Sequence, residues 1–175
     1  MLIEKLVKMF TQLAMLILLA RYLGPENVGQ LMYCFTIASI FIFLSGLGLD
    51  TLLIKIFVDL PNKAHSYLKH ALIARVLAGF LCVILINLIG FFLIGSDSRL
   101  ILFFISLYHL FMPLTVYEWY FQSRGRGELS AIALIIGHIS GFIFRLICLY
   151  FGGDLVWLGA AYTFETFIMA VSFRF

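Results

Sequence analysis

The chain has 175 residues, of which 63% are hydrophobic and only 12% are charged. A soluble globular domain has roughly 45–50% apolar and about 25% charged residues, so this composition excludes a soluble protein. A mean hydropathy of +1.10 also excludes a disordered chain, a coiled coil and a basic nucleic-acid-binding domain. The composition therefore predicts an integral membrane protein with no nucleic-acid partner.

The charged residues lie between long apolar stretches and do not alternate with apolar residues, as they would in the strands of a membrane β-barrel. Each stretch is close to the roughly 17–25 residues that a helix needs to cross a bilayer. We therefore predict an all-α integral membrane protein with about six transmembrane helices in a single unit over residues 1–175. The predicted helices span residues 3–21, 29–53, 73–95, 99–121, 129–151 and 154–173.

The predicted connections contain residues that are typical of turns. Gly24 and Pro25 end the first helix, and Pro61 interrupts the longest connection, whose apolar part over residues 54–60 we expect to lie along the inner membrane surface. The other predicted turns cover residues 95–98, 122–128 and 152–154.

The net charge of +3 carries less information than the positions of Lys and Arg along the chain. If the amino terminus is cytoplasmic, nine basic residues lie inside and two outside, with Arg145 within a helix. This bias predicts that both termini are cytoplasmic. Lys63, Lys69, Arg124 and Arg126 of the inner connections would attract an anionic headgroup, although positive-inside topology alone also explains them. The inside residues are Lys5, Lys8, Lys55, Lys63, Lys69, Arg75, Arg124, Arg126 and Arg174, and the outside ones are Arg21 and Arg99.

Two histidines and two charged residues lie at least six residues from either end of their predicted helices. At 1.5 Å per residue, His109, His138 and Glu165 lie about 15–20 Å from the outer ends of their helices and Arg145 about 9 Å. A charge at mid-membrane costs about 2.5–3.5 kcal/mol even on the mildest scale, so these residues need a structural or functional reason. The long side chains of Arg145 and Glu165 span the difference in depth, and we predict that they form an ion pair.

Polar residues also recur at helical spacing in the fourth and fifth predicted helices. We expect these stripes to line a hydrated cavity, in which Arg145, His138, His109 and Tyr117 bind substrate and Glu165 couples transport to an ion. The alternative is that the charged pair only joins two helices and that main-chain carbonyls satisfy the histidines. The stripes consist of Ser106, His109, Pro113 and Tyr117, and of His138, Gly141 and Arg145, with Gly137 and Gly141 forming a GxxxG motif.

No pattern in the sequence indicates a metal, a cofactor or an enzymatic reaction. Cys34, Cys82 and Cys148 lie in apolar helices without a neighbouring His or a CxxC pair, which predicts buried free thiols. The sequence also lacks a phosphate-binding glycine loop, a pair of catalytic carboxylates and a Ser-His-Asp set. We therefore expect a protein that is not an enzyme and has no cofactor.

Three runs resemble the amino-terminal half of Wzx-type polysaccharide repeat-unit flippases of the MOP superfamily. The runs are Arg21-Tyr22-Leu23-Gly24-Pro25-Glu26 followed by Gly29, Gly46-Leu47-Gly48-Leu49-Asp50, and Tyr117-Glu118-Trp119-Tyr120-Phe121-Gln122. The resemblance covers nearly the whole chain, and the signature residues are Arg21, Gly24, Pro25, Gly29, Gly48 and Asp50. It implies a bacterial inner-membrane protein that moves an undecaprenyl-diphosphate-linked oligosaccharide between leaflets during surface polysaccharide biosynthesis, such as that of O-antigen and lipopolysaccharide.

Such flippases have about a dozen helices in two MATE-like lobes, and this chain resembles only the first lobe. We therefore expect an incomplete transporter that needs a second six-helix lobe or a second copy of the chain, with membrane lipids around it. The alternatives are a MATE-like cation antiporter, a membrane polysaccharide polymerase or ligase, and an inactive truncated product. The short predicted outer turns argue against a polymerase, and Arg145 argues against a cation antiporter.

Overall fold

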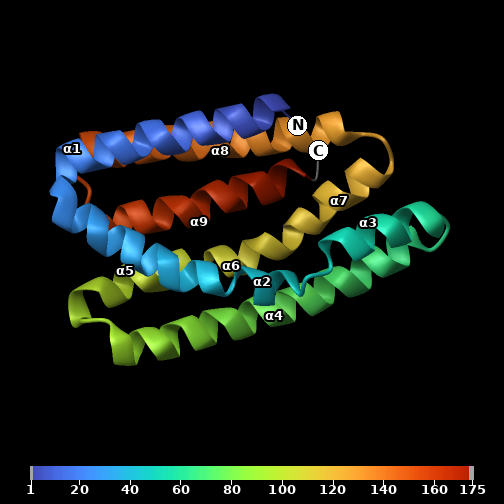
Figure 1. Cartoon of the computed structure of the whole chain (residues 1–175), viewed down its shortest axis with the longest axis horizontal. Coiled ribbons are helices and arrows are strands. Elements are labelled where there is room, and N and C mark those ends of the chain that lie inside the picture. Colours follow the sequence, from blue (N-terminus) through green and yellow to red (C-terminus); the bar gives the residue numbers. More distant parts are fainter. Residues whose placement is uncertain (1, 174–175) are drawn as a thin grey trace.

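The computed structural model describes residues 2–173, except for the side chains of Leu2 and Asp97. Every regular element in this part of the chain is helical (Figure 1). Arg174, which the topology prediction counts as an inside residue, lies outside the described residues. The elements are α1 (Leu2–Ile40), α2 (Ile42–Gly46), α3 (Asp50–Asp59), α4 (Ala64–Leu93), α5 (Ser96–Ser106), α6 (Tyr108–Phe111), the 3-10 helix η1 (Met112–Thr115), α7 (Val116–Ser123), α8 (Gly127–Tyr150) and α9 (Leu155–Ser172).

The described chain has five helical segments that are long and apolar enough to cross a membrane, whereas the sequence predicts six helices. The difference arises in the first segment, Ile3–Asp59, which joins the first two predicted helices. The predicted turn between them is replaced by a kink at Gly24, whose φ of 80° and ψ of 162° are not helical. Figure 1 shows that the chain reverses direction at this bend of α1.

The fourth predicted helix, over residues 99–121, is interrupted twice. Leu107 separates α5 from α6, and a 3-10 turn at Met112–Thr115 separates α6 from α7. Pro113 lies in this turn and is buried. Proline has no N–H to donate to the preceding turn, which explains why the α-helix is interrupted here.

The second predicted helix, over residues 29–53, is interrupted as well. α2 ends at Gly46, and Leu47 and Gly48 both have positive φ, at 55° and 59°. α3 then begins at Asp50, so the segment expected to lie on the inner surface belongs to a helix that contacts α4 and α7. The remaining predicted helices correspond to α4, which begins earlier at Ala64, and to α8 and α9.

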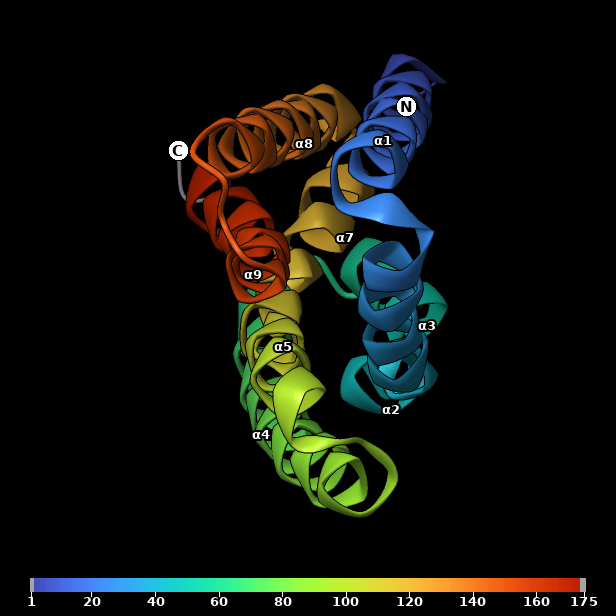
Figure 2. The ribbon, with the colours of Figure 1, turned by 90° about the vertical axis from the view of Figure 1, so that its left-hand side faces the viewer.

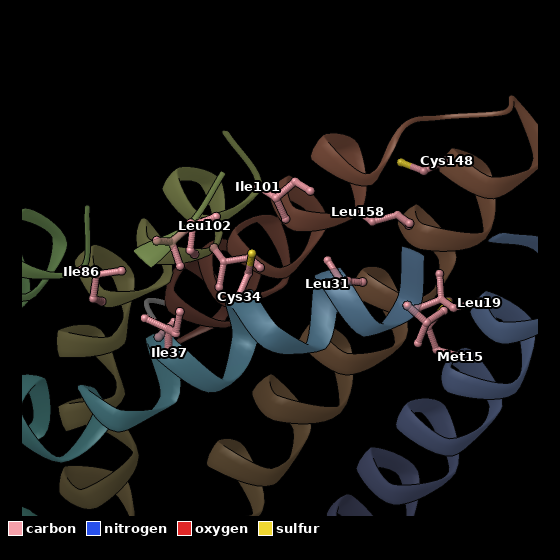
Figure 3. Close-up of a cluster of buried hydrophobic side chains, with 14 of the residues drawn as sticks. Met15, Leu19, Leu31, Cys34, Ile37, Ile86, Ile101, Leu102, Cys148 and Leu158 are labelled. Carbon is pink, nitrogen blue, oxygen red and sulfur yellow. The ribbon is translucent and has the colours of Figure 1, made fainter. Parts of the chain in front are cut away.

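The helices form two groups, which we call walls (Figures 1 and 2). In one wall, α8 packs against both the first limb of α1 and α9. The second limb of α1 and the segments α2 to α7 form the opposite wall, and the walls meet where α5 packs against α9. The larger apolar core joins α1, α4, α5, α8 and α9 at the end near the α1 bend (Figure 3). A smaller core around Leu53, Phe57 and Val116 joins α3, α4 and α7 at the other end. Cys34, Cys82 and Cys148 are buried free thiols, as predicted.

Candidate functional site

A cavity of about 470 Å³ lies between the two walls. Helices from both walls line it, including the first turns of α1, the α6 and α7 segments, and α8 and α9. Its lining is partly apolar but includes nine titratable residues, and ionisable groups among membrane helices are costly and mark functional sites by default. The titratable residues of the lining are Glu4, Lys8, Asp50, Tyr108, His109, Glu118, His138, Tyr162 and Glu165.

Glu165 of α9 is the centre of a polar network with α8. Its Oε2 forms the predicted ion pair with Nη2 of Arg145. Nδ1–H of His138 donates a hydrogen bond of 2.7 Å to its other oxygen, Oε1. The side chain of Glu165 is 13% exposed and that of Arg145 only 4% exposed. Each carboxylate oxygen is therefore held by a different residue of the same neighbouring helix.

The GxxxG motif makes room for this network. A Cβ added at Gly141 would lie 2.7 Å from Cβ and 2.8 Å from Oε2 of Glu165. A Cβ at Gly137 would lie 2.1 Å from Cγ of Met169, one turn further along α9. The two glycines thus allow α8 and α9 to pack closely, as small residues in a GxxxG motif generally do in membrane helices.

Arg145 differs from its predicted position. The sequence places it in the cavity as a substrate-binding residue, but it is not among the lining residues and lies buried behind Glu165. Its guanidinium stacks over the ring of Tyr162 at 4.1 Å. Arg145 therefore contacts two residues that line the cavity, Glu165 and Tyr162, without lining the cavity itself.

His109 lies at the point where the two interrupted helices meet. A carbonyl oxygen can only accept, so Nε2–H of His109 donates to Ala38 O at 3.1 Å and the Ser45 hydroxyl donates to Nδ1 at 3.0 Å. The His109 side chain borders the cavity, but it is fully buried. Both ring nitrogens of His109 are thus hydrogen-bonded, one to α1 and one to α2. This agrees with the alternative given above, in which His109 has a structural role.

The main chain of His109 is also in close contact with α4. A Cβ added at Gly79 would lie 2.2 Å from the His109 carbonyl oxygen. Pro113, four residues later, has no N–H to bond this carbonyl. A glycine on α4 therefore lets that helix approach the break at Pro113.

Tyr117 is not among the lining residues of the cavity, although the sequence predicts that it binds substrate. It is half-buried and packs against the smaller core of α3, α4 and α7. The next two residues, Glu118 and Trp119, line the cavity instead. The 3-10 turn before α7 shifts the helical register of the predicted stripe, which explains the difference. Glu118 accepts a hydrogen bond of 3.0 Å from Nε2 of Gln122.

The predicted headgroup-attracting residues Lys63, Lys69, Arg124 and Arg126 are all exposed. Nη2 of Arg124 donates to Pro61 O at 3.2 Å, which joins the α7–α8 turn to the α3–α4 turn. Figure 1 shows both turns at the end of the molecule where α1 begins. We call this end the basic end.

A second ion pair is not predicted by the sequence. Arg75, which the topology prediction counts as an inside residue, is 1% exposed within α4, and its Nη2 pairs with Oδ1 of Asp50, whose side chain is 48% exposed. The spacing of small and apolar residues was an available signal, because Arg75 continues a stripe at intervals of three and four residues. The buried stripe of α4 is Ala64, Leu68, Ala71, Arg75, Gly79, Cys82, Ile86 and Gly90.

The signature residues lie mainly at backbone irregularities. Gly24 and Gly48 have positive φ, a conformation that glycine adopts at little cost. Pro25 follows the bend at Gly24, where its fixed φ suits the start of a helical limb. Arg21 and Gly29 are exposed near the same bend. These positions therefore shape the chain, apart from Asp50, which borders the cavity.

These features define a multi-pass helical membrane protein with a polar cavity between two helical walls. A family model described as polysaccharide biosynthesis protein matches residues 1–174, so the chain belongs to this family of Wzx-like flippases. Its members are typically transporters and not enzymes. Comparisons with curated proteins and with solved structures give no significant match.

Proposed function

We propose that this protein takes part in moving an undecaprenyl-diphosphate-linked oligosaccharide across the bacterial inner membrane. The observation that carries the proposal is the 470 Å³ cavity, which places ionisable side chains among membrane-spanning helices in a chain of the polysaccharide biosynthesis family. Polar groups at membrane depth line the pathways of transported molecules. O-antigen and other surface polysaccharides contain repeat units of this class.

The proposal includes six passes through the membrane with both termini in the cytoplasm. The segment Ile3–Asp59 has 57 residues, which at 1.5 Å per residue measure about 85 Å and greatly exceed the roughly 30 Å hydrocarbon core. The bend at Gly24 divides it into two limbs, one for each of the first two passes. Alkaline phosphatase fusions after Asn27 and Ser98 should be active and those after Lys63 and Arg124 inactive. The opposite pattern contradicts this topology.

The distribution of charge suggests where each part of the substrate binds. Within the lining, Lys8 is the one Lys or Arg among several carboxylates, so the cavity suits the hydroxyl groups of sugars better than a diphosphate. The exposed cations Lys63, Lys69, Arg124 and Arg126 of the basic end suit the diphosphate at the headgroup level.

Glu165 is the proposed ion-coupling residue. It borders the cavity, and both of its oxygens are held by α8, through Arg145 and His138. Binding of a proton to the carboxylate removes its charge and weakens the ion pair with Arg145. A change in protonation would thereby alter the contact between two membrane helices.

Transport by matched variants tests the role of this pair. In a complete two-lobed flippase, Arg145→Ala should abolish transport of an anionic repeat unit while insertion into the membrane continues, and Arg145→Lys should retain part of the activity. Lys55→Ala, which removes an exposed cation of α3, is the control and should transport normally. A double variant with Arg145→Leu and Glu165→Met that transports normally at equal abundance would show that the pair is only structural.

The proposed partner is a second six-helix lobe or a second copy of this chain, since a polar cavity in lipid must be closed on every side. Expression of residues 1–175 alone in a flippase-null strain should not restore surface polysaccharide, and co-expression with a second lobe should. Restoration by residues 1–175 alone would contradict the need for a separate lobe and favour a homodimer.

The carboxylates of the cavity favour a second candidate, a MATE-like cation antiporter. Glu4 and Glu118 line the cavity together with Asp50 and Glu165, and only the latter two are paired with an arginine. An organic cation would be attracted to such a lining. Efflux of ethidium from cells that express the complete transporter, with no restoration of polysaccharide, would favour this candidate over the flippase.

A further inference from the structure

A second polar hollow, of about 610 Å³, lies at the end of the molecule opposite the basic end. It is formed by the bend of α1, the α8–α9 turn and the adjacent ends of α5 and α9, and Figure 2 faces this end. Its polar side chains are Tyr22, Asn27, Gln30 and Asp154. We call these four residues and the space between them the outer groove.

The outer groove has a firm apolar floor. Ile101, which lines it, is only 2% exposed and belongs to the larger core. Leu149 and Leu155 line it as well and pack against the same core. Figure 3 shows Ile101 beside Leu158 and Leu31 within this core. A packed floor fixes the position of the polar groups around it.

Two glycines of the α8–α9 turn keep the outer groove open. Gly152 has a φ of 67°, which strains any other residue. A Cβ added at Gly153 would lie 2.9 Å from the carbonyl oxygen of Cys148. Both glycines line the groove, so the tight turn presents main chain to it where side chains would otherwise occupy space.

Two polar side chains of the groove have oxygen atoms that can accept hydrogen bonds from a ligand. Nδ2 of Asn27 donates to Leu23 O at 2.9 Å, which fixes the amide and leaves its oxygen as an acceptor. Asp154 is the N-cap residue of α9, but its carboxylate makes no capping hydrogen bond. An Asp at this position usually bonds the first turn of its helix. Helix capping by the side chain therefore does not account for Asp154.

The chemistry of the lining selects the class of ligand. The two amides and the phenol can donate and accept hydrogen bonds, the carboxylate accepts them, and no Lys or Arg is among the lining residues. Such a site suits a molecule with many hydroxyl groups and disfavours phosphate. We propose that the outer groove binds the sugar part of the lipid-linked oligosaccharide at the end opposite the basic end. This inference rests on the proposed function and adds a second sugar subsite to it.

The two tryptophans of the chain provide separate reporters. Trp119 lines the central cavity. Trp157 is exposed in the first turn of α9, next to the groove residue Val156, and its main-chain N–H donates to Asp154 O at 3.0 Å. The Trp119→Phe chain reports on the outer groove and the Trp157→Phe chain on the central cavity. Each is purified in detergent and titrated with oligosaccharides released by mild acid from the surface polysaccharide of the source bacterium, and separately with inorganic pyrophosphate.

We expect the oligosaccharide, and not pyrophosphate, to change the emission of Trp157 in a saturable way. In the same background, Asp154→Asn or Gln30→Leu should weaken this binding about tenfold, as expected when a hydrogen bond to the ligand is lost. Glu26→Gln is the matched control, because Glu26 is an exposed carboxylate at the α1 bend that does not line the groove. It should leave the binding unchanged. Isothermal titration of otherwise unaltered chains repeats the comparison without a tryptophan substitution.

The outcomes separate this inference from the proposed function. A response of Trp119 alone supports the central cavity as the sugar site and overturns the outer groove. A response of Trp157 alone supports the groove and overturns sugar binding in the central cavity. No response from either reporter overturns both, and a Trp157 response that survives Asp154→Asn and Gln30→Leu overturns the groove.

Discussion

The two walls of the cavity are held together by different kinds of contact. On one side, α8 and α9 are uninterrupted helices whose polar contacts involve Arg145, His138 and Glu165. On the other, α1, α2 and α6 meet at helix breaks through hydrogen bonds of His109 to Ser45 and to the main chain. The first contact depends on full charges, and the second depends on neutral dipoles.

The comparison shows that the stability lost with a polar contact in a membrane depends on whether the contact is charged or neutral. A buried charge must keep its partner, because loss of one member leaves the other uncompensated. Neutral interhelical hydrogen bonds in membrane proteins average only about 0.6 kcal/mol, since the unfolded chain finds other partners in the membrane. We therefore expect all-or-none behaviour where a buried charge loses its partner and graded behaviour where a neutral hydrogen bond, such as that of His109, is lost.

The largest effect is expected for Glu165→Ala, which leaves both Arg145 and His138 without their carboxylate. The free energy of unfolding should fall by about 3–5 kcal/mol, measured by reversible unfolding in mixed detergent micelles. Glu128→Ala, which removes an exposed carboxylate from α8, is the control and should change it by less than about 0.5 kcal/mol. Equal losses in both variants would contradict the role assigned to the charged network.

The pair of Asp50 and Arg75 tests the same rule in the opposite wall, with partners of unequal exposure. The side chain of Arg75 is 1% exposed and that of Asp50 48% exposed. Asp50→Ala should therefore cost about 3 kcal/mol, because it strands a buried cation, while Arg75→Met should cost only about 1 kcal/mol, because Asp50 keeps its contact with water. A larger loss of stability for Arg75→Met than for Asp50→Ala in the same unfolding assay would show that burial of the remaining partner does not determine the loss.

Replacing a glycine by alanine at a close helix contact should lower stability by a smaller amount. The amount should depend on which atoms the added methyl group contacts. Gly79→Ala places it against the main-chain carbonyl of His109, whereas Gly137→Ala places it against the flexible side chain of Met169. Destabilisation should be about 2–3 kcal/mol for Gly79→Ala and about 1 kcal/mol for Gly137→Ala. Thermal stability in detergent checks the order, and similar values would mean that the α4 contact relaxes as readily as the α8–α9 contact.

The smallest effect is expected for the hydrogen bond between His109 and Ser45. A double-mutant cycle of His109→Leu and Ser45→Ala should give a coupling energy of about 0.6 kcal/mol. A coupling several times larger would show that this neutral hydrogen bond also behaves in an all-or-none way, and would remove the distinction between charged and neutral contacts.

The ion pair of Arg145 and Glu165 illustrates what depth along a helix predicts. Both residues lie in helices that are continuous in the structure, so counting 1.5 Å per residue placed them within reach of each other. The same reasoning failed for Tyr117, because the breaks at Leu107 and at Pro113 precede it and change the direction of the following side chains. Counting residues predicts the depth and direction of a side chain only where the helix is uninterrupted.

The sequence alone determined that the chain is helical and crosses the membrane, because apolar stretches of this length are stable only as helices in lipid. It also determined the family resemblance and the positions of the turns after α4, α7 and α8. Only the tertiary structure decided that Arg75 pairs with Asp50, that Arg145 lies behind Glu165, and that His109 is enclosed. The physical reason is that hydropathy reports the cost of a residue in lipid, whereas its partner is set by packing between helices that are distant in sequence.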